Sequence, residues 1–248
     1  MNVDLNGKVA LVTGGSRGLG REMVLGFAAS GADVVIASRK LDACQALAGE
    51  VTDRFGVRAL PFACNVGAWA QCDALVEAAY DEFGRVDVLV NNAGMSPIYP
   101  SLAEVSEALY DKVFATNLKG AFRLTALIGE RMANGEGGRV INISSVASVH
   151  PDPILLPYAA AKAGLNAFTE GFARAYAPRV RVNTIVCGMF RTDIIQAWTP
   201  EMLDAFTPQV VLGRVGEPAE IVGAALFLAS DASSYCTGAH LRLDGGTR

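Results

Sequence analysis

The stretch Thr13-Gly14-Gly15-Ser16-Arg17-Gly18-Leu19-Gly20 lies between a short apolar run, Val9–Val12, and a run of helical period, Arg21–Ser30. Glycine at positions 14, 18 and 20 permits a tight turn, a close approach of the backbone to a phosphate group and close packing of the following helix. The first turn of that helix offers amide donors and a favourable dipole to an anion. A glycine trio alone is often an ordinary turn, but its place between a strand and a helix predicts a dinucleotide-binding loop.

Short runs typical of strands alternate with longer runs of helical period along the whole chain. The expected strands are Val9–Val12, Asp33–Ala37, Arg58–Phe62, Val86–Val90, Arg139–Ile143, Arg181–Val186 and His240–Leu243. This alternation predicts an α/β fold with a doubly wound, parallel seven-stranded sheet and helices on both faces. No linker, repeat or low-complexity tract divides the 248 residues, so we expect a single domain over residues 1–248. Ligands of such sheets bind beyond the carboxyl ends of the strands.

Composition excludes several classes of function. A net charge of −4, with Lys and Arg spread along the chain, disfavours nucleic acid as a partner. No stretch approaches the roughly 20 apolar residues that span a bilayer, and the first residues do not resemble a signal peptide, so we expect a cytoplasmic protein without a membrane anchor. Five widely spaced cysteines and two distant histidines predict neither a disulfide framework nor a metal site.

The end of the second expected strand bears on the choice of coenzyme. An acid there would bind the 2′-hydroxyl of an adenosine ribose, but Ala37 is followed by Ser38-Arg39-Lys40. A guanidinium matches a 2′-phosphate with two charge-assisted hydrogen bonds, and Arg17 in the glycine loop is a second candidate for the same phosphate. We therefore predict NADP(H) over NAD(H). The alternative is that Arg39 and Lys40 merely begin a solvated helix.

Tyr158-Ala-Ala-Ala-Lys162 places a phenol and an ammonium one helical turn apart. A nearby cation favours phenolate and would lower the phenol's pKa toward the working range of a proton shuttle. Ser144-Ser145 ends the fifth expected strand, where a hydroxyl can hold a reacting oxygen. Each motif alone also has a plain structural reading, namely a helix surface or a turn former.

These features occur together with Asn91-Asn92-Ala93-Gly94, with Asn117 and with a closing Asp244-Gly245-Gly246, all in one order. In these motifs the chain resembles the short-chain dehydrogenase/reductase family, in particular its single-domain, 3-oxoacyl reductase-like members, over nearly its whole length. The resemblance implies a Rossmann-type fold and hydride transfer between a nicotinamide and a carbonyl or secondary-alcohol carbon. A homotetramer, or at least a homodimer, is implied as well, since the helix after Pro157 carries many Ala and Gly residues and pairs with its copy in the family.

By the same resemblance, Tyr158 is the general acid in reduction and the base in oxidation, and Lys162 holds the nicotinamide ribose. Ser145, which precedes Tyr158 by the family's usual 13 residues, binds the reacting oxygen, and Asn117 supports a proton-relay water. The implied coenzyme-binding residues are Gly14, Ser16, Arg17, Gly18, Leu19, Gly20, Ser38, Arg39, Asn65, Val66, Asn91, Ala93, Gly94, Tyr158, Lys162, Gly188, Phe190 and Thr192.

The chain departs from the family pattern at two places. Asn65 stands where many members have an Asp that bonds the adenine, and Cys187-Gly188 replaces the usual Pro-Gly beside the nicotinamide. Cys187 is either a packing residue or a reactive thiol, and burial of free cysteines in general favours packing.

The segments His150–Leu156 and Ile194–Phe206, the second with Ile195, Trp198, Met202 and Phe206, are candidates for a lid. Their apolar content favours a hydrophobic or acyl-type substrate over a phosphosugar. In the alternative reading Trp198 and Phe206 only anchor a helix to the core, and His150 is solvated. Two other functions remain open, an NADPH-dependent enoyl (C=C) reductase and a catalytically silent NADP(H)-binding regulator.

Overall fold

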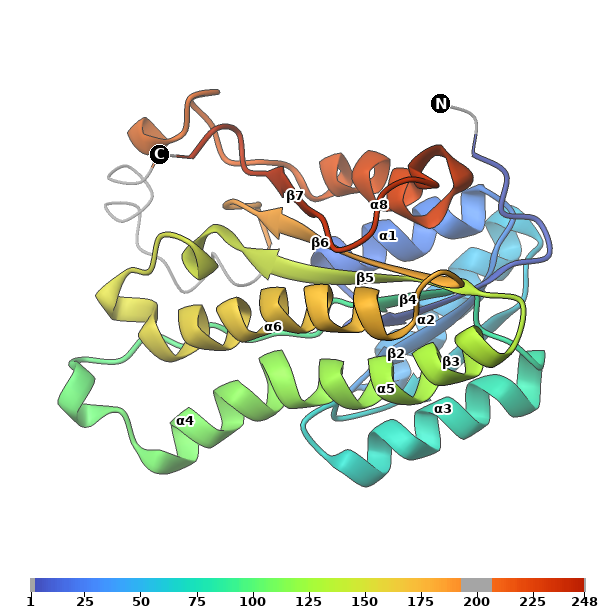
Figure 1. Ribbon diagram of the computed structural model, residues 1–248, viewed down its shortest axis with the longest axis horizontal. Coiled ribbons are helices and arrows are strands. Elements are labelled where there is room, and N and C mark those ends of the chain that lie inside the picture. The colour runs from blue at the N-terminus through green and yellow to red at the C-terminus, as the bar shows by residue number, and fades with distance from the viewer. Residues whose placement is uncertain (1–2, 193–206, 248) are drawn as a thin grey trace.

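The computed structural model describes residues 3–192 and 207–247, and within them the predicted fold is confirmed. Seven strands form one sheet in the order β3-β2-β1-β4-β5-β6-β7, and every neighbouring pair is parallel (Figure 1). The strands are β1 Val9–Thr13, β2 Asp33–Ser38, β3 Ala59–Ala63, β4 Val88–Asn91, β5 Gly138–Ser145, β6 Val180–Cys187 and β7 His240–Leu243. The strands differ from the expected ranges by at most two residues at either end.

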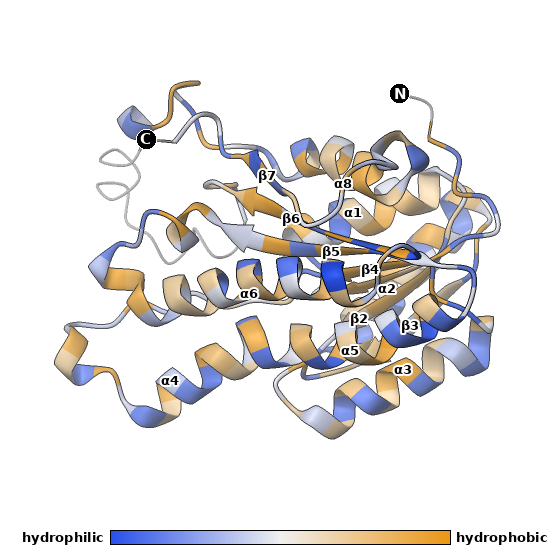
Figure 2. Cartoon of the chain, viewed as in Figure 1, coloured by the Kyte–Doolittle hydropathy of each residue, from blue (hydrophilic) through white to orange (hydrophobic). Residues whose placement is uncertain are grey.

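Helices cover both faces of the sheet, as a doubly wound fold requires. One face carries α1, α2 and α8, and the other carries α3, α5 and α6, with α4 leading into α5 (Figure 1). Apolar side chains of the strands meet both layers, so the sheet is buried on its two sides. Figure 2 shows the strands coloured largely as hydrophobic. The helices are α1 Gly18–Ala29, α2 Leu41–Phe55, α3 Trp69–Phe83, α4 Glu107–Phe114, α5 Gly120–Asn134, α6 Leu156–Ala175 and α8 Ile221–Ala229.

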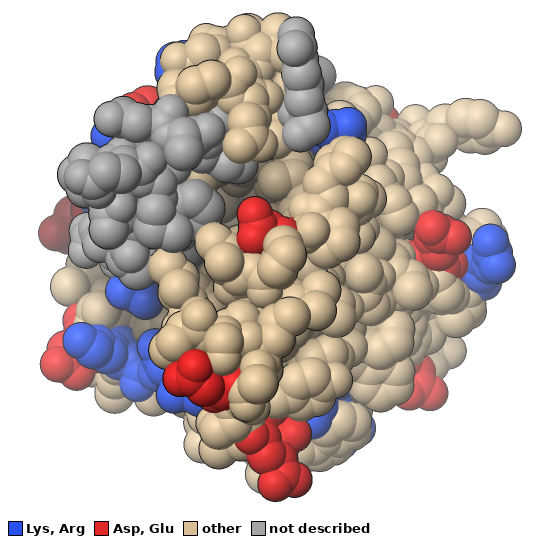
Figure 3. All heavy atoms as spheres, turned by 90° about the vertical axis from the view of Figure 1, so that its left-hand side faces the viewer, with Lys and Arg blue, Asp and Glu red and all other residues tan. Residues whose placement is uncertain are grey.

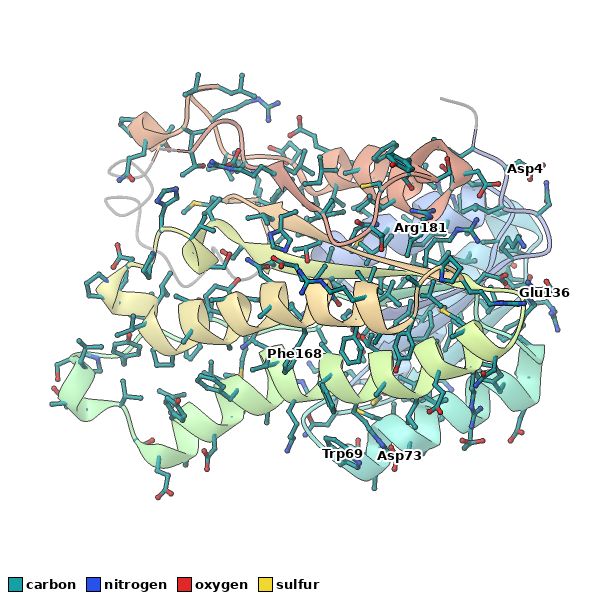
Figure 4. All side chains as sticks on the ribbon, in the orientation of Figure 1. Asp4, Trp69, Asp73, Glu136, Phe168 and Arg181 are labelled. Carbon is teal, nitrogen blue, oxygen red and sulfur yellow. The ribbon has the colours of Figure 1, made fainter. Side chains whose placement is uncertain are left out.

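Aromatic side chains join the three helices of the second layer. Phe122 on α5 packs against Phe168 on α6, with ring centroids 5.3 Å apart, and against Trp69 on α3 at 6.3 Å. Beside them Arg123 pairs with Asp73 across α5 and α3, at 2.6 Å (Figure 4). These contacts fix α6 against its neighbours.

A buried chain of polar side chains ties α6 to the centre of the sheet. Asn91, Asn142 and Thr184 lie side by side in register on β4, β5 and β6. Asn91 Nδ2 donates to Asn142 Oδ1 at 2.8 Å, Asn142 Nδ2 donates to Thr169 Oγ1 on α6 at 2.8 Å, and the Thr169 and Thr184 hydroxyls lie 2.7 Å apart. Because hydrogen bonds in a buried environment are directional and costly to break, this chain sets where α6 sits along the sheet.

The substitution Asn142→Ala tests this chain. It leaves the Asn91 amide and the Thr169 hydroxyl each without one partner in the interior, so we expect the free energy of unfolding to fall by about 2–3 kcal/mol. Urea denaturation measures the change, with Asn134→Ala at the exposed end of α5 as the control, for which we expect less than about 0.5 kcal/mol. Equal effects of the two substitutions would show that the buried chain contributes little.

Candidate functional site

One pocket of about 1080 Å³ lies at the carboxyl edge of the sheet, where the glycine loop, the ends of β2 to β6 and the start of α6 meet. Figure 3 shows this edge of the molecule face-on: most of the described surface there is uncharged, and Lys and Arg gather mainly on one side. Most of the predicted site residues line this pocket, although they come from segments as far apart as residues 14 and 192.

The glycine loop is fixed by contacts that leave no room for larger residues. Gly14 has a φ of +63°, and a Cβ there would lie 2.9 Å from Asn92 Nδ2, while a Cβ on Gly20 would lie 2.2 Å from the carbonyl oxygen of Gly14. Asn92 Nδ2 donates to the carbonyl oxygens of Thr13 and Gly14 at 2.9 and 3.2 Å. These hydrogen bonds attach the loop to the end of β4. Gly14, Ser16, Arg17, Gly18 and Leu19 line the pocket, and Gly20 lies behind its wall.

The end of β2 brings cations to the same wall. Ser38 Oγ accepts a hydrogen bond from Ser16 Oγ at 3.0 Å, which holds the second strand against the glycine loop. Arg39 and Lys40 follow, exposed, and Arg17 lies across from them on the loop. Arg39 forms no salt bridge with any described residue. This end of the pocket is built for an anion.

The loop after β3 closes the pocket beyond β2. Asn65 and Val66 both line it, together with Cys64. The Asn65 Oδ1 accepts from the backbone N–H of Gly67 at 3.1 Å, which leaves the side-chain amide Nδ2 as its remaining donor. A flat base with ring nitrogens is an acceptor for such a donor.

Ser145, Tyr158 and Lys162 meet at the other end of the pocket. Ser145 is the last residue of β5, and its hydroxyl lies near enough to the Tyr158 hydroxyl to influence the pKa of that phenol. Lys162 Nζ donates to the carbonyl oxygen of Ile143 on β5 at 2.7 Å and lies 5.7 Å from the centroid of the Tyr158 ring. Both α6 residues are thus held against the same strand.

Proton affinities in this cluster differ from the sequence-based expectation. Burial raises the pKa of Tyr158 to about 12, although the neighbouring Ser145 hydroxyl acts to lower it. Burial also lowers the pKa of Lys162 from 10.5 to about 8, despite a nearby Cys187 that acts to raise it. The net shift of the phenol's pKa in the protein alone is therefore upward rather than downward as expected, because burial disfavours the charged form of both groups. Tyr158 is a protonated acid at neutral pH.

Asn117 lies in a π-helical turn, Ala115–Lys119, between α4 and α5. Its side chain is buried and fully engaged: Nδ2 donates to the carbonyl oxygens of Met95 and Val113, each at 2.9 Å, and Oδ1 accepts from Met95 N–H at 3.1 Å. Single π-turns often occur at functional sites because they displace backbone hydrogen bonds. Any contribution of Asn117 to a proton relay would come from its backbone, since its amide holds the loop that begins at Met95.

The loop after β6 forms the remaining wall. A Cβ on Gly188 would lie 2.7 Å from Asp244 Cα, so only glycine fits there, and the Thr192 side chain lies close to Gly18 of the glycine loop. Phe190 is 7% exposed and lines the pocket. Cys187 is buried in the core, and burial raises the pKa of its thiol to about 12. This favours the packing role over a reactive thiol, because the thiolate is the nucleophile.

Besides Gly20, a second predicted coenzyme contact, Asn91, is not on the pocket wall. Asn91 is 4% exposed, and its amide donates to Asn142 and Thr125, so its side chain belongs to the buried chain inside the sheet. Its neighbour Asn92 lines the pocket instead. The two side chains point to opposite sides because consecutive residues at the end of a strand alternate.

Thr13 supports the site from behind the pocket wall. Its hydroxyl accepts from the N–H groups of Asn92 and Ala93, at 3.0 and 3.1 Å, and so joins β1 to the β4 loop. Its place at the start of the glycine motif was the available sequence signal. Several lining residues had no such signal, because they come from distant loops and helices: Lys112, Thr116, Met95, Ser96, Gln209 and Thr247.

The segment before α6 is one of the two expected lid segments. Tyr99 Oη donates to the carbonyl oxygen of Pro153 at 2.6 Å and accepts from Leu156 N–H at 2.8 Å. Tyr99, in the loop after β4, therefore fixes the position of this segment. His150, Ile154 and Leu155 line the pocket. The other expected segment, Ile194–Phe206 with Ile195, Trp198, Met202 and Phe206, lies outside the described residues.

The described helices include none that is both long and apolar enough to cross a bilayer. Across residues 3–192 and 207–247, no three His, Cys, Asp or Glu side chains come together in a way that would hold a metal ion.

Comparison with known proteins identifies the family. The family model for short chain dehydrogenase matches residues 8–203. The chain is 39% identical over 245 residues to the 3-oxoacyl-(acyl-carrier-protein) reductase of Vibrio cholerae, covering 98% of each protein, and 37% identical to a D-threitol dehydrogenase of Mycolicibacterium smegmatis, covering 98% of this chain and 93% of that one.

Solved structures agree. The NADPH-dependent 3-quinuclidinone reductase of Rhodotorula rubra superposes with a TM-score of 0.93 at 29% identity, covering 98% of this chain and 92% of the other. A short-chain type dehydrogenase/reductase from Mycobacterium marinum gives a TM-score of 0.92 at 33% identity, covering 98% and 96%. The chain therefore belongs to the short-chain dehydrogenase/reductase family and is an NAD(P)-dependent oxidoreductase that acts on C=O or CH-OH groups.

Proposed function

We propose that this protein is an NADPH-dependent ketone reductase in which Ser145 and Tyr158 together bind the substrate oxygen. The observation that carries the proposal is the placing of Ser145, Tyr158 and Lys162 together on the wall of a pocket that continues to the glycine loop. Two neighbouring hydroxyls can both turn to one carbonyl oxygen placed beside them. Ser145 then orients that oxygen, and Tyr158 is positioned to give it a proton.

The pKa of Tyr158 indicates which form of the phenol is present. Its pKa of about 12 keeps the proton on the phenol at neutral pH, which suits donation to an oxygen that is gaining negative charge. Bound NADPH supplies the hydride. In the reverse direction the phenolate is the form that accepts the proton of the alcohol. We therefore propose that Tyr158 is the proton donor of the reduction at neutral pH.

Lys162 is proposed to hold the nicotinamide ribose through Nζ, while its bond to the Ile143 carbonyl keeps it in place. A Cβ on Gly94 would lie 3.6 Å from Nζ, so the small residue there leaves Lys162 open on one side to a ligand. When a sugar hydroxyl replaces lost solvent around the ammonium, the charged form becomes less costly. This gives Lys162 a reason to be buried although burial disfavours its charge.

NADP(H) is the proposed coenzyme. Arg17, Arg39 and Lys40 line one end of the pocket, and no acidic side chain among the described residues lines that end. Gly14 and Gly20 have no room for a side chain, so the loop stays tight and its backbone is bare. A pyrophosphate can therefore approach that backbone closely, as binding of a dinucleotide requires. Binding at this wall is proposed for Ser16, Gly18, Leu19, Ser38, Asn65, Val66, Ala93, Gly188, Phe190 and Thr192 as well.

An enoyl reductase and a silent NADP(H)-binding regulator are the rival functions, and the paired hydroxyls favour neither. A C=C bond has no oxygen on the reacting carbon for both hydroxyls to bind. A protein that only binds NADP(H) needs no buried proton donor such as Tyr158.

We further propose a homotetramer that pairs α6 with its copy. Ala160, Ala163, Ala167 and Gly171 form an exposed stripe of small residues along that helix, which permits close approach of a second helix. The cytoplasmic location stays a prediction from the sequence.

The substitution Tyr158→Phe removes the proposed proton donor and little else. We expect kcat for reduction of a ketone to fall at least about 100-fold, while NADPH binds with unchanged affinity. Stopped-flow turnover and coenzyme fluorescence measure the two quantities. Tyr110→Phe, which removes a hydroxyl from an exposed side chain on α4 away from the pocket, is the matched control. Near-normal turnover in Tyr158→Phe would refute the assignment.

Coenzyme preference is tested with Arg39→Gln. Because charge-assisted hydrogen bonds to the 2′-phosphate are lost, we expect kcat/KM for NADPH to fall about tenfold or more, with little change for NADH. Arg54→Gln on α2, which removes an exposed guanidinium away from the pocket, controls for net charge. An unmodified protein that uses both coenzymes equally, or prefers NADH, contradicts the proposal.

Burial of Lys162 predicts a pH-dependent stability difference. Since its pKa is 10.5 when exposed and about 8 when folded, the unfolded chain binds more protons between these values and stability rises with pH across that window. Lys162→Met removes a cost of about 3 kcal/mol at pH 7, offset in part by the lost bond to Ile143. We expect its free energy of unfolding, relative to the unmodified protein, to be greatest below pH 8 and to shrink toward pH 10.5.

Urea denaturation at pH 7 and pH 10 measures this difference. Lys119→Met, at an exposed position, should show a difference that does not change with pH. A relative stability of Lys162→Met that grows as pH rises would contradict the buried-ammonium account.

A further inference from the structure

Positively and negatively charged side chains lie at different ends of the pocket. Among the described lining residues the cations are Arg17, Arg39, Lys40, Lys112 and Lys162, and the single acid is Asp152. Arg17, Arg39 and Lys40 lie at the glycine-loop end, and Lys112 precedes Ala115, which lies against Gly67 after β3. Asp152 comes from the opposite side, on the segment before α6, beyond Ser145 and Tyr158. The cations therefore serve the coenzyme, and the acid faces the space left for the substrate.

No cation among the described residues pairs with Asp152. Within residues 3–192 and 207–247 it forms no ion pair, and the rest of its side of the pocket is lined by uncharged groups such as Met95, Ser96, Ile154 and Leu155, with His150 beside it. A phosphate or carboxylate of a substrate at this end would meet, among the described side chains, no positive charge and one negative one.

The position of the Asp152 carboxylate is fixed by its neighbours. Oδ1 accepts from Ile154 N–H at 3.0 Å, which caps the short turn Pro153–Leu155 and leaves the second oxygen free. Tyr99 clamps the same turn through Pro153 and Leu156. Because the Asp152 carboxylate is already held in place, little side-chain conformational entropy is lost when it binds a cationic ligand. Its contribution to selectivity is therefore retained.

Building on the proposed ketone reduction, we propose that Asp152 is a specificity-determining residue which selects compact ketones with a cationic group, such as an amine, remote from the carbonyl. The carbonyl oxygen lies at Ser145 and Tyr158, and the cationic group is directed toward Asp152. Anionic ketones are disfavoured at the same place. The net charge of −4 adds a weak general attraction for cations.

Three ketones of nearly one shape test the proposal: N,N-dimethyl-4-oxopiperidinium, which is a permanent cation, its uncharged carbon analogue 4,4-dimethylcyclohexanone, and the anion 4-oxocyclohexanecarboxylate. Assays with NADPH at pH 8, where histidine side chains are mostly uncharged, measure kcat/KM for each. We expect the cation to exceed the uncharged ketone about fivefold and the anion to fall below it, with the difference reduced at high salt.

Asp152→Asn isolates the charge, because the Asn side-chain carbonyl can still cap Ile154 N–H. We expect it to bring the cation and the uncharged ketone to about equal kcat/KM, leaving the uncharged ketone and the KM for NADPH unchanged. Asp53→Asn, at an exposed position of α2 away from the pocket, makes the same change in net charge and should leave the preference intact.

An unmodified protein that shows no preference for the cation, or prefers the anion, overturns the proposal. So does an Asp152→Asn variant that loses activity equally toward the charged and uncharged ketones, since that identifies a structural role. Failure of the unmodified protein to reduce any of the three ketones contradicts the proposed reduction itself, and the inference with it.

Discussion

The site depends on one constraint, the docking of α6 against β5. That docking brings the Tyr158 hydroxyl to the Ser145 hydroxyl and the Lys162 ammonium to the Ile143 carbonyl. Asn142 and Thr169 fix the same helix further along through a buried hydrogen bond of 2.8 Å. Apolar packing alone would tolerate a small slide of α6, whereas paired polar groups in the interior tolerate very little, because each broken bond leaves an unsatisfied group. The relative positions of Ser145, Tyr158 and Lys162 therefore follow from the packing of α6 on the sheet.

Burial gives the reacting groups their character. Removed from water, a phenol keeps its proton and an ammonium tends to lose its own, and burial shifts the pKa values of Tyr158 and Lys162 in these two directions. The first shift suits the proton donor that we propose. The second is a cost that the proposed contact of Lys162 with a sugar hydroxyl would offset. The arginines that we propose for a phosphate lie at the far end of the pocket, and Arg39 there is exposed, so solvent already stabilises its charge.

Much of the fold could be predicted from the sequence, because strand runs such as Val9–Val12 and the glycine loop after them are local signals. The motif residues of the site were also within reach, since a parallel sheet brings its carboxyl ends to one edge. The sequence did not show that the Asn91 side chain lies inside the sheet, because the motif does not say which of two adjacent side chains faces inward. The pKa of Tyr158 was misjudged because one helical turn reveals a neighbouring charge but not the loss of solvent. The role proposed for Asp152 could not be predicted from the sequence, because it depends on where the described cations of the pocket lie.

Ser145 and Tyr158 are proposed to hold the same substrate oxygen, and the proposed function depends on it. A crystal structure with NADP⁺ and a bound secondary alcohol tests this most directly. We expect the alcohol oxygen within hydrogen-bond distance, roughly 2.6–3.2 Å, of both hydroxyls, with its carbon facing the nicotinamide ring. An alcohol bound with its oxygen away from Tyr158, or a Tyr158 side chain turned out of the pocket, would contradict it.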